Sequence, residues 1–89
     1  LYKWLRTSPN SVVTIGKSIN NTLQITWDMQ SNIAPLHAEI RLENGIPRLY
    51  PVDGDLYFHN RVVPIGRKIT LYHGDSFQIG LTHFRYLES

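Results

Sequence analysis

The sequence predicts an all-β protein, and three observations support this fold class. No segment of the 89 residues keeps a helical spacing of apolar side chains over several turns. Short runs rich in β-branched and aromatic residues instead alternate with Gly, Pro, Asn and Asp, which favour turns. About ten such runs follow one another at short spacing, as they do in β-sandwiches and β-barrels.

The N-terminal part is expected to hold three strands separated by polar turns. β-Branched and aromatic side chains mark the first two strands, and alternation of apolar with polar side chains marks the third. A Ser-Pro-Asn-Ser turn at residues 8–11 separates the first two strands. The three expected strands are residues 1–6, 12–15 and 23–27.

A β-hairpin is expected around Asn44-Gly45. Residues 38–42 alternate apolar and polar side chains, which is the pattern of a strand with one buried face, and residues 46–50 form the second arm. Asn-Gly favours this turn because both residues tolerate the positive φ of a type I′ turn. A two-residue loop sets Ile40 opposite Leu49 on the core face.

The same register sets Arg41 opposite Arg48 on the solvent face. Two like charges in this position are unfavourable by themselves. Glu39 and Glu43 are their diagonal neighbours, so we expect the two carboxylates to offset the repulsion.

The C-terminal half is expected to hold five further short strands. Pro51 and the Asp53-Gly54-Asp55 segment end the preceding strand because proline lacks an amide hydrogen and glycine favours a turn. The expected strands are residues 56–58, 61–63, 68–71 and 77–79, followed by a last strand that carries Phe84 and Tyr86.

Composition narrows the class of protein. The chain has no cysteine, so no disulfide framework holds it together, and this is compatible with a reducing, cytoplasmic location. Its net charge is +2 with the charges interspersed, so we expect no nucleic-acid partner. No apolar segment approaches the ~20 residues that span a bilayer, so we expect no direct membrane contact from this segment. Because the chain begins with Leu, we expect a single domain over residues 1–89 within a longer protein.

Three groups of residues carry side chains that can support catalysis or metal binding. Gly74-Asp75-Ser76 resembles the nucleophile block of some ester hydrolases, but a small all-β chain lacks their α/β scaffold, so a hairpin turn is favoured. The carboxylates of Asp53 and Asp55 fit turn chemistry. Three histidines, His59, His73 and His83, match no compact spacing of metal ligands. We therefore expect no enzyme, no metal and no cofactor.

Four landmarks follow one another along the chain. They are a β-branched run that ends in Gly16-Lys17, the segment 33–40 with His-Ala-Glu-Ile at its end, a strand-turn-strand over 57–63, and a closing Gly-Asp hairpin over 73–80. In this order they resemble the motifs of the forkhead-associated (FHA) domain family. The resemblance implies an FHA-like β-sandwich of about ten to eleven short, mostly antiparallel strands. It also implies a non-catalytic module that binds phosphothreonine peptides through loops at one end.

The chain departs from this family at the positions that bind phosphate. The family carries a Ser and an Arg where this chain has Ala34 and Pro35, which offer neither a hydroxyl donor nor a charge. Lys17 replaces an Arg and keeps the charge without the planar fork of donors. The family's peptide-anchoring Asn falls at Gly54 or Asp55. The departures predict that phosphothreonine recognition is lost.

The resemblance assigns roles to the residues of the loop end. His37 is expected to brace a loop from within, and a peptide is expected to meet residues of the flanking loops. The expected peptide-binding residues are Lys17, Ser18, Asn20, Ser31, Asn32 and Asn60. The favoured hypothesis is a protein-interaction or scaffolding module, with a protein or peptide partner, in a larger signalling or membrane-associated protein. The alternative is a phosphopeptide-binding FHA domain that uses these substitute loop residues.

Overall fold

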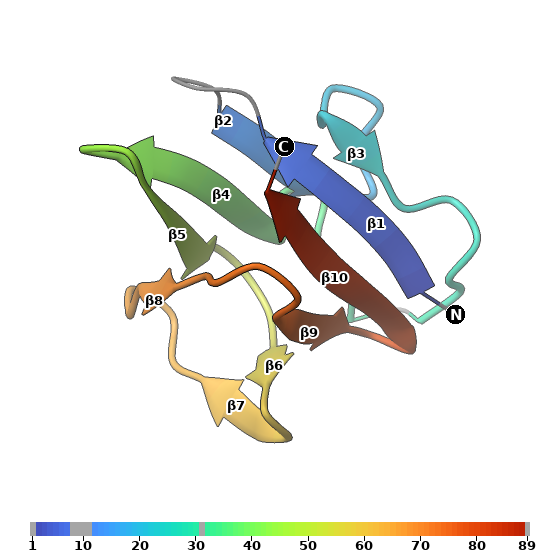
Figure 1. Cartoon of the computed structure of the whole chain (residues 1–89). Helices are drawn as coiled ribbons and strands as arrows, with labels where there is room; N and C mark the ends of the chain where they lie inside the picture. Colours follow the sequence, from blue (N-terminus) through green and yellow to red (C-terminus); the bar gives the residue numbers. More distant parts are fainter. Residues whose placement is uncertain (1, 8–11, 31, 89) are drawn as a thin grey trace.

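A computed structural model describes residues 2–7, 12–30 and 32–88 as two five-stranded sheets packed face to face (Figure 1). The first, called the β9 sheet after its central strand, has the order β1-β10-β9-β6-β7. Its strands are β1 (Tyr2–Thr7), β10 (Thr82–Glu88), β9 (Ser76–Ile79), β6 (Leu56–Phe58) and β7 (Arg61–Val63). The prediction of an all-β sandwich is confirmed, and the described residues contain no helix.

The second sheet, called the β4 sheet, has the order β3-β2-β4-β5-β8. Its strands are β3 (Leu23–Gln24), β2 (Val12–Gly16), β4 (Ala38–Glu43), β5 (Ile46–Pro51) and β8 (Ile69–Thr70). Most neighbouring strands are antiparallel, whereas β1 pairs with β10 and β2 pairs with β3 in parallel. In Figure 1, β1 and β10 lie in front of the β4 sheet.

The β4–β5 hairpin has the predicted register. Ile40 pairs with Leu49, and both side chains are completely buried. Asn44 has a φ of 53° and Gly45 a φ of 78°, as a type I′ turn requires. The turn and the buried face therefore select the same pairing.

Charges on the outer face of this hairpin compensate one another as expected. Arg41 pairs with Arg48 across the strands. Arg41 donates to Glu39 in an ion pair with an N···O distance of 2.5 Å, and Glu43 Oε1 lies 3.9 Å from Arg48 Nε. Tyr50 also donates its hydroxyl to Glu43, and the guanidinium of Arg41 lies over the Tyr50 ring, 5.2 Å from its centroid.

The core lies between the two sheets and consists of inward-facing aliphatic and aromatic side chains. Phe77 of β9 and Phe84 of β10 are cross-strand partners, and their rings stack with centroids 5.2 Å apart. The buried aliphatic residues around them include Ile15, Ile40, Leu49, Leu56 and Ile79. Alternation along each strand therefore places one face in the core.

Two predicted strands are shorter than expected. The third was expected over residues 23–27 but ends at Gln24. The N–H of Ile25 still donates to the Gly16 carbonyl of β2, at 2.7 Å, and the chain then leaves the β4 sheet. Trp27 instead donates its indole N–H to Thr82 in the other sheet. The eighth was expected over residues 68–71 and covers Ile69–Thr70. The turn predicted at residues 8–11 lies outside the described residues.

Candidate functional site

Three loops meet at one end of the sandwich, here called the loop end. They are residues 17–22 between β2 and β3, residues 25–37 between β3 and β4, and residues 52–55 between β5 and β6. Backbone hydrogen bonds of His37 connect the 25–37 loop to the end of β2 and to the 52–55 loop, because its N–H donates to the Ile15 carbonyl and its carbonyl accepts the N–H of Val52. The end of β2 and two loops are therefore fixed relative to one residue.

The side chain of His37 is buried and spans two of these loops. Its Nδ1 accepts the backbone N–H of Ala34 at 3.0 Å, which places the ring proton on Nε2. Nε2 then donates to the carbonyl of Asp55 at 2.7 Å. Gly54 packs against the ring, since a Cβ at this position would lie 2.5 Å from the His37 Cε1 atom. The ring thus holds the loop that carries Ala34 against the loop that carries Asp55.

Ala34 and Pro35 contribute backbone carbonyls to the loop end. The Ala34 carbonyl accepts the N–H of Lys17 at 3.0 Å, and the Pro35 carbonyl accepts that of Ser18 at 3.1 Å. Asn21, which sequence reasoning missed, also donates its amide to Pro35. The backbone carbonyls of Ala34 and Pro35 therefore hold the 17–22 loop against the 25–37 loop. Their side chains offer no hydrogen-bond donor.

A hollow of about 280 Å³ lies between these two loops. Ser18 and Asn20, both named from the sequence, contribute to it, and the Ser18 hydroxyl accepts the N–H of Asn20 at 3.2 Å. The hollow is lined by Thr14, Ser18, Asn20, Asn21, Pro35 and Leu36. The polar side chains that line the hollow therefore carry hydroxyl groups (Thr14, Ser18) or amide groups (Asn20, Asn21).

Lys17 is anchored inside the loop end. Its Nζ donates to the backbone carbonyl of Gln30 at 2.8 Å, and Lys17 does not line the hollow. This contact ties the 17–22 loop to the 25–37 loop. The amine therefore serves to connect the loops in this structure.

Asp28 is a buried carboxylate that the sequence analysis did not single out. Its Oδ1 accepts the N–H of Gln30 at 3.1 Å. Its Oδ2 accepts the N–H of Leu81 and the hydroxyl of Thr82, each at 2.8 Å. Burial by itself raises the pKa of Asp28, but these hydrogen bonds and the positive charge of Lys17 together lower it below the ordinary value.

The Asp28→Asn substitution is expected to destabilise the protein by about 1–3 kcal/mol at pH 7, because the new amide presents a donor to groups that also donate. The lowered pKa means that the carboxylate stabilises the fold above the unfolded-state pKa of about 3.9. This contribution is lost as the pH falls through the folded-state pKa. Urea unfolding of both proteins should therefore show the difference narrowing as the pH falls below the unfolded-state pKa of Asp28. The buried, stabilising role of the Asp28 carboxylate would be contradicted if the difference in free energy of unfolding stayed constant as the pH falls. It would also be contradicted if the exposed control Asp53→Asn destabilised the protein as much at pH 7.

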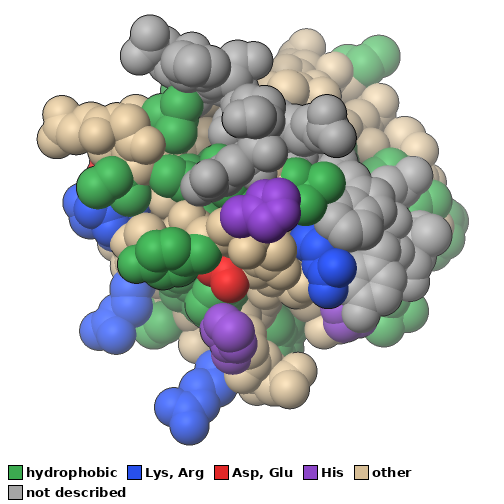
Figure 2. All heavy atoms as spheres, in the orientation of Figure 1, with side chains coloured by type: hydrophobic (Ala, Val, Ile, Leu, Met, Phe, Trp, Pro, Cys, Tyr) green, Lys and Arg blue, Asp and Glu red, His purple; other side chains and the backbone are tan. Residues whose placement is uncertain are grey.

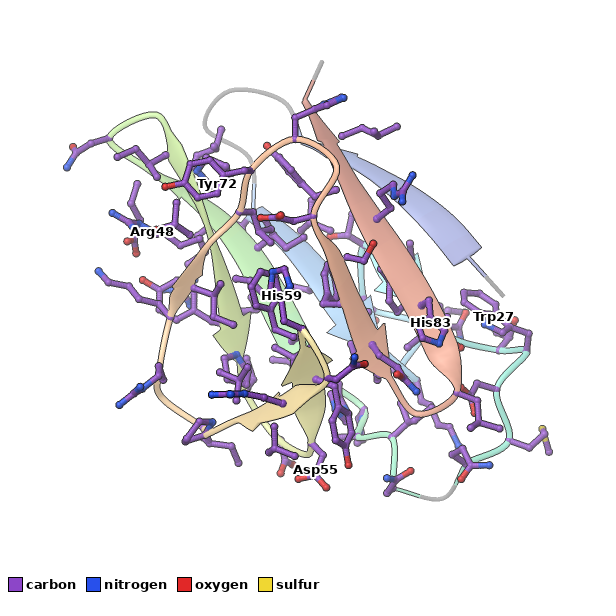
Figure 3. The ribbon with its side chains drawn as sticks, turned by 60° about the horizontal axis from the view of Figure 1, so that its bottom comes forward. Trp27, Arg48, Asp55, His59, Tyr72 and His83 are labelled. Carbon is purple, nitrogen blue, oxygen red and sulfur yellow. The ribbon has the colours of Figure 1, made fainter. Side chains whose placement is uncertain are left out.

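The remaining predicted residues lie in different places. Asn32 is exposed in the 25–37 loop, and Ser31 lies outside the described residues. Asn60 belongs to the β6–β7 turn and lines a different hollow, on the β9 sheet. Asp55 lies at the lower end of Figure 3, and both it and Asp53 are exposed. The loop end thus brings together Lys17, Ser18 and Asn20.

Two further findings concern the part of the chain that the structure describes. It contains no group of three or more His, Asp or Glu side chains placed to hold a metal ion. It also contains no helix long and apolar enough to cross a membrane.

The fold and the braced loops define a β-sandwich domain that presents its loops at one end. Residues 13–80 match the family model of the FHA domain, and the chain therefore belongs to the FHA domain family. FHA domains are non-catalytic protein-interaction modules known for binding phosphopeptides. No curated protein sequence matches the chain significantly.

Solved FHA structures have the same fold. The N-terminal FHA domain of S. cerevisiae Rad53p, in complex with a phosphothreonine peptide, superposes with a TM-score of 0.70 at 20% identity, covering 80% of this chain and 57% of that one. The FhaA FHA domain, complexed with the intracellular domain of Rv3910, superposes with a TM-score of 0.69 at 18% identity. The match covers 86% of this chain and 80% of that one. A longer structure, Rad53 1-466 in complex with AMP-PNP, superposes with a TM-score of 0.72 at 20% identity. The match covers 82% of this chain but 20% of the Rad53 chain.

Proposed function

We propose that this FHA domain is a non-catalytic protein-interaction or scaffolding module that no longer recognises phosphothreonine. The observation that carries the proposal is the hydrogen bond of Lys17, whose Nζ donates to the Gln30 carbonyl at 2.8 Å. Lys17 is the single Lys or Arg in the three loops of the loop end, which also contain Asp28, Asp53 and Asp55. One positive and three negative charges give these loops a net charge of −2.

A phosphate group requires the opposite charge. Phosphothreonine carries about −1.5 to −2 charges and needs cationic partners or several hydrogen-bond donors. Each hydrogen bond to a charged group contributes about 1.5–3 kcal/mol. The two donor side chains absent at Ala34 and Pro35 therefore correspond to about 3–6 kcal/mol, or about a hundredfold to more than ten-thousandfold in affinity.

Apolar contact is the chemistry that the loop end offers instead. Ile19 is 81% exposed and Met29 is 86% exposed, and they project from the two loops that the Lys17–Gln30 contact connects. Covering these two side chains on contact with a partner would remove apolar surface from water, which is favourable. We infer a partner segment that is unphosphorylated and apolar, and a place for the domain within a larger signalling or membrane-associated protein.

The test is a titration of the ¹⁵N-labelled protein with a degenerate phosphothreonine peptide pool and with its unphosphorylated counterpart. At millimolar peptide, we expect no amide shift that depends on the phosphate. Phosphate-dependent shifts confined to residues 17–22 and 32–36 would overturn the proposal.

A second candidate function is phosphopeptide binding through substitute groups. The observation in its favour is that Ser18 and Asn20 line the loop-end hollow, where hydroxyl and amide groups can donate to a phosphate. The same titration decides between the two functions. If phosphate-dependent shifts occur, the Lys17→Gln variant should abolish them, because Lys17 would have to leave Gln30 and pair with the phosphate.

A further inference from the structure

We propose that Met29 is an oxidation site that regulates the loop end: a peroxide converts its thioether to the sulfoxide, which weakens contact with an apolar partner. This regulation rests on the proposed function, because it concerns the same exposed apolar side chains. The chain has one Met and no Cys, so Met29 carries the one sulfur atom of the 89 residues. A peroxide therefore meets a single thioether and no competing thiol.

The Met29 side chain is open to a small oxidant. It is 86% exposed, more than any other large hydrophobic residue in the part of the chain that the structure describes. Figure 2 shows hydrophobic side chains at the right-hand edge of the molecule, where the segment after β3 runs in Figure 1. Because oxidation depends on access to the sulfur, Met29 should react at a rate close to that of a methionine in a short peptide.

Hydrogen bonds fix both neighbours of Met29 along the chain. The buried carboxylate of Asp28 accepts the N–H of Leu81 at 2.8 Å. Gln30 donates its N–H to Asp28 at 3.1 Å, and its carbonyl accepts the Nζ of Lys17 at 2.8 Å. None of these bonds uses the Met29 side chain, so an oxygen on its sulfur leaves them in place. Oxidation should therefore change the surface without unfolding the loop.

The reaction of Met29 with hydrogen peroxide is balanced without a cofactor. A lone pair of the thioether sulfur attacks one peroxide oxygen, the S–O bond forms, the O–O bond breaks, and the other oxygen leaves as water after proton transfer. The sulfur is thereby oxidised and the peroxide reduced. Methionine sulfoxide reductases reverse the change, because thiols supply the electrons, become a disulfide and release the oxygen as water.

Oxidation places a polar group at the proposed contact. Met29 and Ile19 are the two exposed large apolar side chains among the described residues of the loops that the Lys17–Gln30 contact connects. Covering a thioether is favourable, whereas covering a sulfoxide oxygen removes it from water and is costly unless the partner donates a hydrogen bond. Losing the burial of one methionine side chain corresponds to about a ten- to hundredfold rise in the Kd for an apolar partner.

The first measurement is the oxidation itself. After treatment of the native protein with millimolar hydrogen peroxide, we expect an intact mass higher by about 16 Da, one oxygen atom, with the gain in the peptide that contains Met29. Met29→Leu should gain no mass under the same conditions. The oxidised and reduced proteins should have the same midpoint of urea unfolding. A thioether that stays unoxidised while N-acetylmethioninamide in the same solution is converted, or a lowered midpoint, would overturn the proposal.

The second measurement is binding of the unphosphorylated degenerate peptide pool, followed by ¹⁵N amide shifts at residues 17–22 and 28–30. We expect the apparent Kd of the oxidised protein to exceed that of the reduced protein about tenfold or more, and a sulfoxide reductase with dithiothreitol to restore the lower value. Met29→Leu should show the same Kd before and after peroxide. Met29→Gln should bind weakly without peroxide. Ile65→Gln makes a similar polar change at a 62% exposed position in the β7–β8 loop and should bind like the native protein.

The outcomes distinguish this regulation from the proposed function. No binding of the pool to the reduced protein would overturn the proposed function, and the regulation with it. Equal binding of the pool to the reduced and oxidised proteins would overturn the regulation alone. A peroxide effect that persists in Met29→Leu would do the same, because it would belong to another residue.

Discussion

The Ile40→Ala substitution is expected to lower the free energy of unfolding by about 2–5 kcal/mol, the range for truncating a fully buried isoleucine. Ile40 has no exposed surface and pairs with the equally buried Leu49 at the centre of the β4 sheet. Removing three methyl or methylene carbons from this position therefore leaves a cavity between the two sheets. Urea denaturation followed by tryptophan fluorescence measures the change.

Ile65→Ala is the matched control for this prediction. Ile65 lies in the β7–β8 loop and is 62% exposed, so the same truncation should change stability by no more than about 0.5 kcal/mol. A result for Ile40→Ala as small as that of the control would show that the register of the hairpin is wrong.

Gly16→Ala is expected to destabilise the protein by about 1–3 kcal/mol or more through overpacking. A Cβ at this position overlaps the carbonyl oxygen of Pro35 and lies 2.7 Å from its carbonyl carbon. Because these are backbone atoms, no side-chain rotation relieves the clash. The 25–37 loop must move away from the end of β2, which breaks the hydrogen bonds from Lys17 and Ser18 to that loop.

Hydrogen exchange separates this effect from a general loss of stability. The amides of Lys17 and Ser18 should exchange faster in Gly16→Ala relative to those of the β4–β5 hairpin. Gly66→Ala is the comparison, because Gly66 has a φ of 91° and open space around its Cβ position. That variant introduces backbone strain far from the loop end and should leave the relative exchange of Lys17 and Ser18 unchanged.

Local sequence signals predicted the parts of the fold in which neighbouring residues decide the structure. Asn44-Gly45 and the alternation on both sides of it were sufficient for the hairpin register, including the pairing of Arg41 with Arg48. A one-residue slip would move every buried side chain to the solvent face, so the pattern permits one register. The third strand was predicted too long, because the alternation continues past the point where Trp27 turns to Thr82 of the other sheet.

Part of the loop end was also accessible from the sequence. His37 was identified as a brace through the family resemblance, and the structure shows it spanning Ala34 and Asp55. Asn21 and Asp28 were missed because an Asn in a turn and an Asp in a polar stretch are ordinary in sequence. Asp28 acquires its environment from Leu81 and Thr82, more than fifty residues away along the chain.

The sequence by itself determined the all-β class, the central hairpin, the FHA family and the absence of the donor side chains at residues 34 and 35. These features depend on residue type and on spacing along the chain. The tertiary structure alone decided that Lys17 is engaged by Gln30, that Asp28 is buried against the β9–β10 turn, and that Asn60 lines a hollow on the β9 sheet instead of the loop end. Each depends on how distant segments approach once the two sheets pack, and such an approach leaves no periodic signal in the sequence.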